Sequence, residues 1–165
     1  MTTYSGGLRV SELIHLRVRD IDSERMTIRI KNRKGGKDRY TILSQRLLDE
    51  LRCYWKKYRL ENFLFPSAFR DKVLVRQSPN LAFKAVKKKA GITKKVTFHS
   101  LRHTFATNLL EAGVDIRTIQ ILLGHSAITT TARYLHVARK NIKAVKSPLD
   151  MFDLPDTDRF KRLNS

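Results

Sequence analysis

The sequence predicts an α+β fold that is mainly α-helical and carries a small three-stranded antiparallel sheet. The segments that read as strands all lie before residue 45, whereas apolar residues at helical spacing dominate the chain after it. The chain has 165 residues, of which 41% are hydrophobic. This size and composition favour one domain with a real core over two small ones.

Three short segments are expected to form the sheet: residues 18–21, 26–30 and 40–43. The second, MTIRI, alternates and is rich in β-branched residues. The loop between the second and third segments contains Gly35 and Gly36 next to each other, which is typical of a β-hairpin turn. A helical apolar pattern at residues 8–16, with Ser11 and Glu12 facing away from it, is expected to precede the sheet.

Five helices are expected after the hairpin, at residues 45–60, 79–90 and 99–112, from residue 116 to Gly124, and from Thr129 or Thr130 onward. Ser44 and Asp115 are suitable N-caps, and glycines follow the ends of several of these segments. The first helix should bury the apolar residues Leu47, Leu48, Leu51 and Trp55. The third should bury Leu101, Phe105, Leu109 and Ala112.

The net charge of +19, from 34 basic and 15 acidic residues, indicates a polyanionic partner. Nucleic acid fits best, ahead of a protein that is merely basic or an anionic membrane surface. The single cysteine, Cys53, is expected to pack in a helix and permits no internal disulfide, which fits a reducing compartment. The sequence shows no apolar run long enough for a membrane span and no signal-peptide pattern at its start, so we expect a cytoplasmic protein.

Residues 98–136 concentrate the chemistry. His99, Arg102 and His103 are spaced i, i+3 and i+4, so one helix face should carry two imidazoles and a guanidinium. On an exposed face this set suits an anion rather than a metal ion, because arginine grips phosphate and repels cations. Single residues do not decide this: His99 and Arg102 could be a solvated face, His125 a residue that stabilises a helix end, and Tyr134 an ordinary half-buried tyrosine.

Two further groups precede this stretch. Arg9 follows two glycines and could be a surface charge, and Lys34 lies in the hairpin loop and could be a DNA-backbone contact.

The joint pattern resembles the motifs of the tyrosine recombinase (phage integrase) family, Xer-like or integron-like, over about residues 5–140. The matching runs are GLRVSEL from Gly7, KGGKDR from Lys34, HSLRHTFAT from His99, LLGHS from Leu122, and the TTT run from Thr129 with Tyr134 after it. Order and spacing both agree. The resemblance implies the fold of DNA breaking-rejoining enzymes.

The resemblance also implies roles for six residues. Tyr134 would attack a DNA phosphodiester and form a 3′-phosphotyrosyl bond. Arg9 and Arg102 would hold the non-bridging oxygens of the scissile phosphate, and Lys34 would protonate the leaving 5′ oxygen. His99 would assist proton transfer at the tyrosine, and His125 would hydrogen-bond the phosphate.

This chemistry needs fixed cations around phosphate oxygens, and two arginines, a lysine and histidines can supply them in place of Mg²⁺. No metal and no cofactor is therefore expected. The cationic surroundings should favour the ionised form of Tyr134. Lys37 is an alternative to Lys34, and His103 is interpreted as structural. The expected DNA-binding residues are Lys37, Arg39, Lys87, Lys88, Lys89, Lys94 and Lys95.

Residues 1–147 are expected to form a catalytic domain, and residues 148–165 a tail that packs on the domain or on another subunit. Family members usually have further helices and a DNA-binding domain before the arginine motif, so we expect this chain to lack them and to expose apolar surface there. The expected partners are double-stranded DNA and further subunits, as in the family's tetramer. The alternatives are a basic DNA-binding remnant without recombination activity and a type IB topoisomerase-like relaxing activity.

Overall fold

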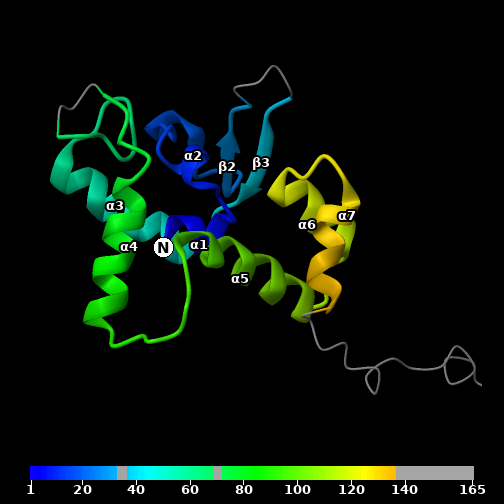
Figure 1. Ribbon diagram of the computed structural model, residues 1–165. Helices are drawn as coiled ribbons and strands as arrows, with labels where there is room; N and C mark the ends of the chain where they lie inside the picture. The colour runs from blue at the N-terminus through cyan, green and yellow to red at the C-terminus, as the bar shows by residue number, and fades with distance from the viewer. Residues whose placement is uncertain (33–36, 69–71, 137–165) are drawn as a thin grey trace, which may run out of the picture.

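The computed structural model describes residues 1–32, 37–68 and 72–136, and Figure 1 shows how their elements are arranged. A small sheet and two short N-terminal helices lie at the centre, with helices α3 and α4 on one side and α6 and α7 on the other (Figure 1). Helix α5 runs below the centre toward α6 and α7. The predicted class, mainly helical with a three-stranded antiparallel sheet, is confirmed. In this described part, no helix has the length and apolarity that crossing a bilayer requires.

The sheet has the order β1-β2-β3, formed by Ile21–Asp22, Thr27–Ile30 and Arg39–Ile42, with both pairs antiparallel. The hairpin prediction is confirmed, although the Gly35–Gly36 turn lies outside the described residues. Ile30 pairs with Arg39, and Ile28 with Thr41. Because side chains alternate along a strand, Arg39 and Thr41 share the inner face with the two buried isoleucines.

The first expected strand is wrong in its first residues. Val18–Asp20 form a 3₁₀ helix, and only Ile21–Asp22 pair as β1. The reason is the buried Asp20 side chain, whose Oδ2 accepts from the backbone N–H of Arg17 at 3.0 Å and whose Oδ1 accepts from the Arg29 guanidinium at 3.0 Å. This carboxylate stabilises a tight turn where the apolar residues alone suggested an extended strand.

The expected helix at residues 8–16 is also different. Thr2–Gly6 form α1, Gly7 ends it with φ 63°, and α2 covers only Val10–Leu13. Gly7 must be a glycine for two reasons: its φ is positive, and a Cβ there would lie 2.5 Å from the Phe105 ring. The chain therefore makes a sharp turn between α1 and α2, and Arg9 lies at that turn as the N-cap of α2.

Helices α3 (Gln45–Tyr58) and α4 (Ser78–Lys89) lie where the sequence places them. The Ser44 hydroxyl accepts from the backbone N–H of Leu47, which confirms the expected N-cap. Leu47, Leu48 and Leu51 are buried as predicted. The predicted burial of Trp55 and Cys53 is wrong, because Trp55 is 40% exposed and Cys53 is exposed. The Trp55 indole instead donates to the carbonyl of Leu60 at 3.0 Å, close to the end of the helix.

Helices α5 (Phe98–Glu111), α6 (Ile116–Leu123) and α7 (Ile128–Ala132) follow, and the 3₁₀ helix η2 (Arg133–His136) continues from α7. Asp115 caps α6 as predicted, accepting from the backbone N–H of Thr118 at 2.9 Å. The buried face of α5 comprises Arg102, Phe105 and Ala106, whereas Ala112 is exposed. The apolar stripe was therefore predicted correctly at Phe105 and wrongly at Ala112.

Two hydrophobic clusters form the core. One joins the sheet, α2 and α3 through Leu13, Ile28 and Leu47, and the other joins α5, α6 and η2 through Phe105, Leu123 and Tyr134. Thr41 of β3 donates to the carbonyl of Gly6 at 2.9 Å, which ties α1 to the sheet. The predicted site residues come from both clusters and meet between them.

Candidate active site

The structure brings together five of the six residues predicted for catalysis. Arg9 comes from the turn before α2, His99 and Arg102 from α5, His125 from the end of α6, and Tyr134 from η2. Lys34, the sixth, lies outside the described residues. The electrostatic effects of Arg9 and Arg102 on His99, His125 and Tyr134 reflect how closely these groups lie.

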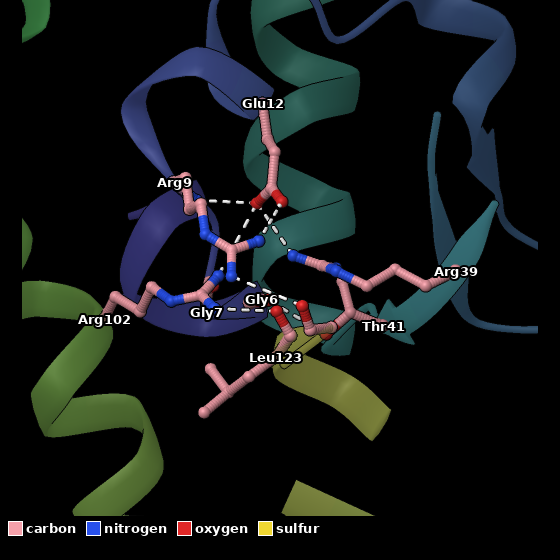
Figure 2. Close-up of polar contacts among 9 residues, drawn as sticks. Gly6, Gly7, Arg9, Glu12, Arg39, Thr41, Arg102 and Leu123 are labelled. Carbon is pink, nitrogen blue, oxygen red and sulfur yellow. Dashed lines mark hydrogen bonds and ion pairs between the residues drawn. The ribbon is translucent and has the colours of Figure 1, made fainter. Parts of the chain in front are cut away.

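Glu12 holds three arginines at the centre of this site (Figure 2). Its carboxylate accepts from Arg9 Nη1 at 2.9 Å and from Arg39 Nη2 at 2.7 Å, and it lies 3.6 Å from Arg102 Nη1. It also accepts from the backbone N–H of Arg9 at 2.7 Å. The expectation that Glu12 faces away from the core is wrong: its side chain is only 13% exposed.

Arg102 is buried, not on an exposed face as its spacing suggested. It is 1% exposed, and it donates from Nη1 to the carbonyl of Gly7 at 2.6 Å and from Nη2 to that of Leu123 at 2.7 Å (Figure 2). Burial, opposed in part by Glu12 and reinforced by Arg9, lowers the pKa of Arg102 to about 10. The guanidinium is therefore still charged at neutral pH, and it links α1, α5 and α6.

Arg9 is the accessible arginine of the group, since 40% of its side chain is exposed. Its Nη2 donates to the carbonyl of Gly124 at 3.3 Å. Arg39, which was expected to contact DNA, is 12% exposed and packs on Gly124, where an added Cβ would collide with its side chain. Burial lowers the pKa of Arg39, and Glu12 opposes that shift.

His125 is held from both sides. Its carbonyl accepts from Gln120 Nε2 at 2.9 Å, and its Nδ1 lies 2.9 Å from the hydroxyl of Thr131, which is 1% exposed. Gly124 (φ 63°) ends α6 and turns the chain so that His125 reaches α7. Burial and the neighbouring cations Arg102 and Arg9 lower the pKa of His125 to about 4, so the imidazole is neutral at physiological pH.

Tyr134 lies at the start of η2 and is 7% exposed. Its hydroxyl lies 3.0 Å from Nδ1 of His103, a residue expected from the sequence to be structural. Burial raises the pKa of Tyr134 more than Arg102, Arg133 and Arg9 lower it. The cations therefore favour the ionised tyrosine, as expected, but burial outweighs them and the net shift of the Tyr134 pKa is upward.

His99 stands edge-on to the His103 ring, with 4.5 Å between the ring centroids. Burial, His103 and Arg102 lower the pKa of His99, in that order. His103 therefore lies between His99 and Tyr134. The spacing of the two histidines in the sequence could not predict which of them contacts the tyrosine.

The other predicted DNA contacts lie on the surface. Lys37, Lys88, Lys89, Lys94 and Lys95 are exposed, and Lys87 is partly exposed. A cleft of about 960 Å³ opens beside Arg9 and His125. Its other lining residues include Lys31, Lys37 and Arg39, while Tyr134 does not line it. Nowhere in residues 1–32, 37–68 and 72–136 do three His, Cys, Asp or Glu side chains gather in a way that could hold a metal ion.

Residues 1–141 match the phage integrase family. The chain belongs to that family. Among curated relatives, tyrosine recombinase XerA of Pyrococcus furiosus is 43% identical over 144 residues, which cover 85% of this chain and 49% of XerA. The chain spans about half the length of the curated relatives it matches.

Solved integrase-family structures match the fold as well. The crystal structure of XerA recombinase superimposes with a TM-score of 0.76 at 37% identity and covers 86% of this chain and 53% of that one. The XerH site-specific recombinase in a post-cleavage complex with its difH substrate gives a TM-score of 0.76 at 25% identity, covering 86% of this chain and 42% of that one. Both support the predicted family and fold.

Proposed function

We propose that this chain is the catalytic part of a site-specific DNA recombinase that cleaves and rejoins DNA strands through a 3′-phosphotyrosyl intermediate. The observation that supports this most is that Arg102 and Arg9 lie close enough to Tyr134 to lower its pKa against the effect of burial, while His125 lies 2.9 Å from Thr131 of α7, the helix that continues into η2. Fixed cations and neutral imidazoles around a buried phenol suit phosphoryl transfer, which depends on positioning and on stabilising charge at phosphate oxygens.

In this proposal Tyr134 attacks the phosphorus and the 5′ oxygen leaves. Arg9, the more exposed arginine, grips a non-bridging oxygen from the cleft side. Arg102 supplies a buried cation, and it keeps N–H donors beyond the two it gives to backbone carbonyls. His125 hydrogen-bonds the phosphate through Nε2, because Thr131 occupies Nδ1.

Lys34 protonates the leaving 5′ oxygen, and the exposed lysines bind the DNA backbone. The covalent ester conserves the energy of the phosphodiester, so rejoining needs no ATP. The catalytic domain comprises residues 1–147 and works in the cytoplasm on double-stranded DNA. Residues 148–165, which lie outside the described residues, contact a neighbouring subunit in a tetramer on DNA.

The test is covalent capture from a pool of nicked duplexes with a randomised core, in which cleavage releases a short fragment and traps the protein. We expect DNA adducts that survive denaturation and share a sequence when the recovered strands are read. Tyr134→Phe is the matched control and should give none. An adduct that survives Tyr134→Phe, or no adduct with the wild type, contradicts the proposed function.

A further inference from the structure

We propose that His103 accepts the proton of the Tyr134 hydroxyl and is therefore a further catalytic residue of the strand-cleavage reaction. This inference rests on the proposed function. The contact is direct: 3.0 Å separates His103 Nδ1 from the Tyr134 hydroxyl, and the ring centroids lie 5.5 Å apart. That distance is within the range for proton transfer between a base and a nucleophile.

No other group competes for this proton in the described part of the chain. Tyr134 is 7% exposed, so bulk water has little access to it. Among the described residues, the one hydrogen-bond partner of its hydroxyl is His103. His99 touches the pair only through the His103 ring, which it meets edge-on. The geometry therefore assigns proton removal to His103 and leaves His99 in contact with the base rather than with the nucleophile.

The protonation states agree with this direction of transfer. Burial raises the pKa of Tyr134, so the phenol keeps its proton at neutral pH and is the donor. Partial burial, followed by the charges of Arg133 and Arg102, lowers the pKa of His103, so its imidazole is neutral and has a free lone pair. That lone pair lies on Nδ1, and Nε2 carries the ring proton. The opposite tautomer would leave the buried phenolic proton without an acceptor.

The step balances in protons and electrons. As the phenolic oxygen bonds to phosphorus, its O–H bond breaks and the proton moves to His103 Nδ1, which gives an imidazolium. The bond between phosphorus and the 5′ oxygen breaks and its electron pair stays on that oxygen. The oxygen then takes a proton from the ammonium group of Lys34, as in the proposed function. Rejoining reverses both transfers. The exposed His103 ring lets water solvate the imidazolium.

Helix α5 places the base and the phosphate-binding arginine in adjacent positions. Arg102 points inward to the carbonyls of Gly7 and Leu123, and His103, about 100° further round the helix, points to η2. The two side chains therefore leave one rigid element in different directions, the arginine toward the carbonyls that hold its guanidinium and the histidine toward the nucleophile.

A first experiment needs no DNA. Nitrogen-15 NMR of the histidine-labelled chain should show His103 Nδ1 unprotonated at neutral pH, with a resonance that shifts in Tyr134→Phe. A protonated Nδ1 in the neutral ring, or a resonance that ignores Tyr134→Phe, overturns the proposal whatever the outcome of DNA capture.

A second experiment measures phosphotyrosyl formation with a duplex recovered from the capture pool. His103→Asn keeps a polar group near Nδ1 but cannot take a proton, so formation should slow by about 10² to 10⁴-fold. The loss should be equal when sulfur replaces the scissile 5′ oxygen, because a thiolate departs without a proton. Lys34→Ala, the control for the other proton transfer, should recover with the sulfur substrate.

The pH profile separates a proton acceptor from a merely structural contact. The wild-type rate should rise with pH through the lowered pKa of His103 and then level off, and His103→Asn should lose that rise. If His99→Asn and not His103→Asn removes the rise, or if His103→Asn cleaves within threefold of the wild type, the proposal is wrong. Absence of any Tyr134-dependent adduct in the wild type would instead contradict the proposed function.

Discussion

Glu12 is the residue on which the three arginines of the site depend. One carboxylate compensates the guanidiniums of Arg9, Arg39 and Arg102, of which Arg102 is fully buried and Arg39 nearly so. Cations that have lost their hydration need such a partner, and removing one member of a buried ion pair leaves the others uncompensated.

We therefore expect Glu12→Gln, which keeps the shape and removes the charge, to lower the free energy of unfolding by roughly 3 kcal/mol. Urea denaturation would measure this. The control is Asp49→Asn, which removes an ion pair with Arg52. In that pair 3.8 Å separates Asp49 Oδ1 from Arg52 Nη1, and both side chains are 58% exposed. The control should cost less than about 1 kcal/mol. Equal losses in the two variants would contradict a structural role for the carboxylate.

His125 should make stability depend on pH. Its pKa is about 4 in the folded chain, against about 6.5 for a histidine in an unfolded chain. Between these values the unfolded state binds the additional proton, so the free energy of unfolding should fall as the pH drops from about 6.5 to about 4. Above about pH 6.5 His125 is neutral in both states, and its titration no longer lowers the free energy of unfolding.

Thermal melts of the wild type and of His125→Gln across this pH range would test the expectation. The variant should show a shallower decrease, because glutamine does not titrate but can still reach the Thr131 hydroxyl. Parallel curves for the two proteins would show that other groups cause the pH dependence.

At the residue scale, the sequence predicted which side chains come together better than it predicted where they point. The spacing of His99 and Arg102 placed both on α5, yet it implied an exposed arginine, because it could not reveal that Gly7 and Leu123 offer carbonyls to a buried guanidinium. Glu12 was misplaced because α2 has four residues, too few to extrapolate a helix face. The contact of His103 with Tyr134 could not be predicted, because it joins residues 31 apart in the sequence.

At the scale of elements, the helices from α3 onward and the hairpin follow from local signals, since caps, periodicity and alternation are visible in sequence. The N-terminal elements do not. Their course depends on Gly7, whose positive φ and lack of a Cβ let α1 approach α5. A glycine pair in sequence suggests a turn, but the Phe105 ring that requires it lies about 100 residues away.

Gly7 and Gly91 allow these two requirements to be separated. Both have positive φ, 63° and 65°, but a Cβ at Gly7 would meet Phe105 at 2.5 Å, whereas nothing lies within 4 Å of one at Gly91. Gly91→Ala should lower the free energy of unfolding by about 1–2 kcal/mol from the backbone alone. Gly7→Ala should lower it by roughly 2–5 kcal/mol, because the ring must also move.

Urea denaturation of both variants, with circular dichroism as the signal, decides this. Equal losses would mean that α1 can shift away from α5 at little cost. A larger loss at Gly7 should also weaken covalent capture, since Arg102 Nη1 donates to the carbonyl of that residue.

At the scale of the whole molecule, the site lies where two hydrophobic clusters meet. Arg9 and Arg39 lie at the start of α2 and on β3, beside the cluster around the sheet, whereas Arg102 and His125 lie on α5 and at the end of α6, beside the cluster that contains Tyr134. Sequence patterns predict the members of each cluster, but the relative placement of the clusters depends on long-range contacts such as that between Thr41 and Gly6. The sequence therefore predicted which residues come together, but it did not predict how they are oriented.

The net charge of +19 should make DNA binding steeply dependent on salt, because each neutralised phosphate releases condensed counterions. The lysines at the end of α4 concentrate charge in the segment that leads to α5, which carries His99 and Arg102. Replacing Lys87, Lys88 and Lys89 with glutamine should make the slope of log affinity against log salt shallower by up to about 2–3 for non-specific duplex DNA.

Fluorescence anisotropy at salt concentrations from about 50 to 200 mM would measure these slopes. Each phosphate contact contributes roughly 0.9 to the slope. The matched control removes three charges from α3, where Arg46, Arg52 and Lys56 are exposed. If direct contacts cause the effect, the α4 variant should change the slope more than the α3 variant. Equal changes would mean that net charge alone attracts the DNA, and an unchanged slope in the α4 variant would remove these lysines from the DNA-binding surface.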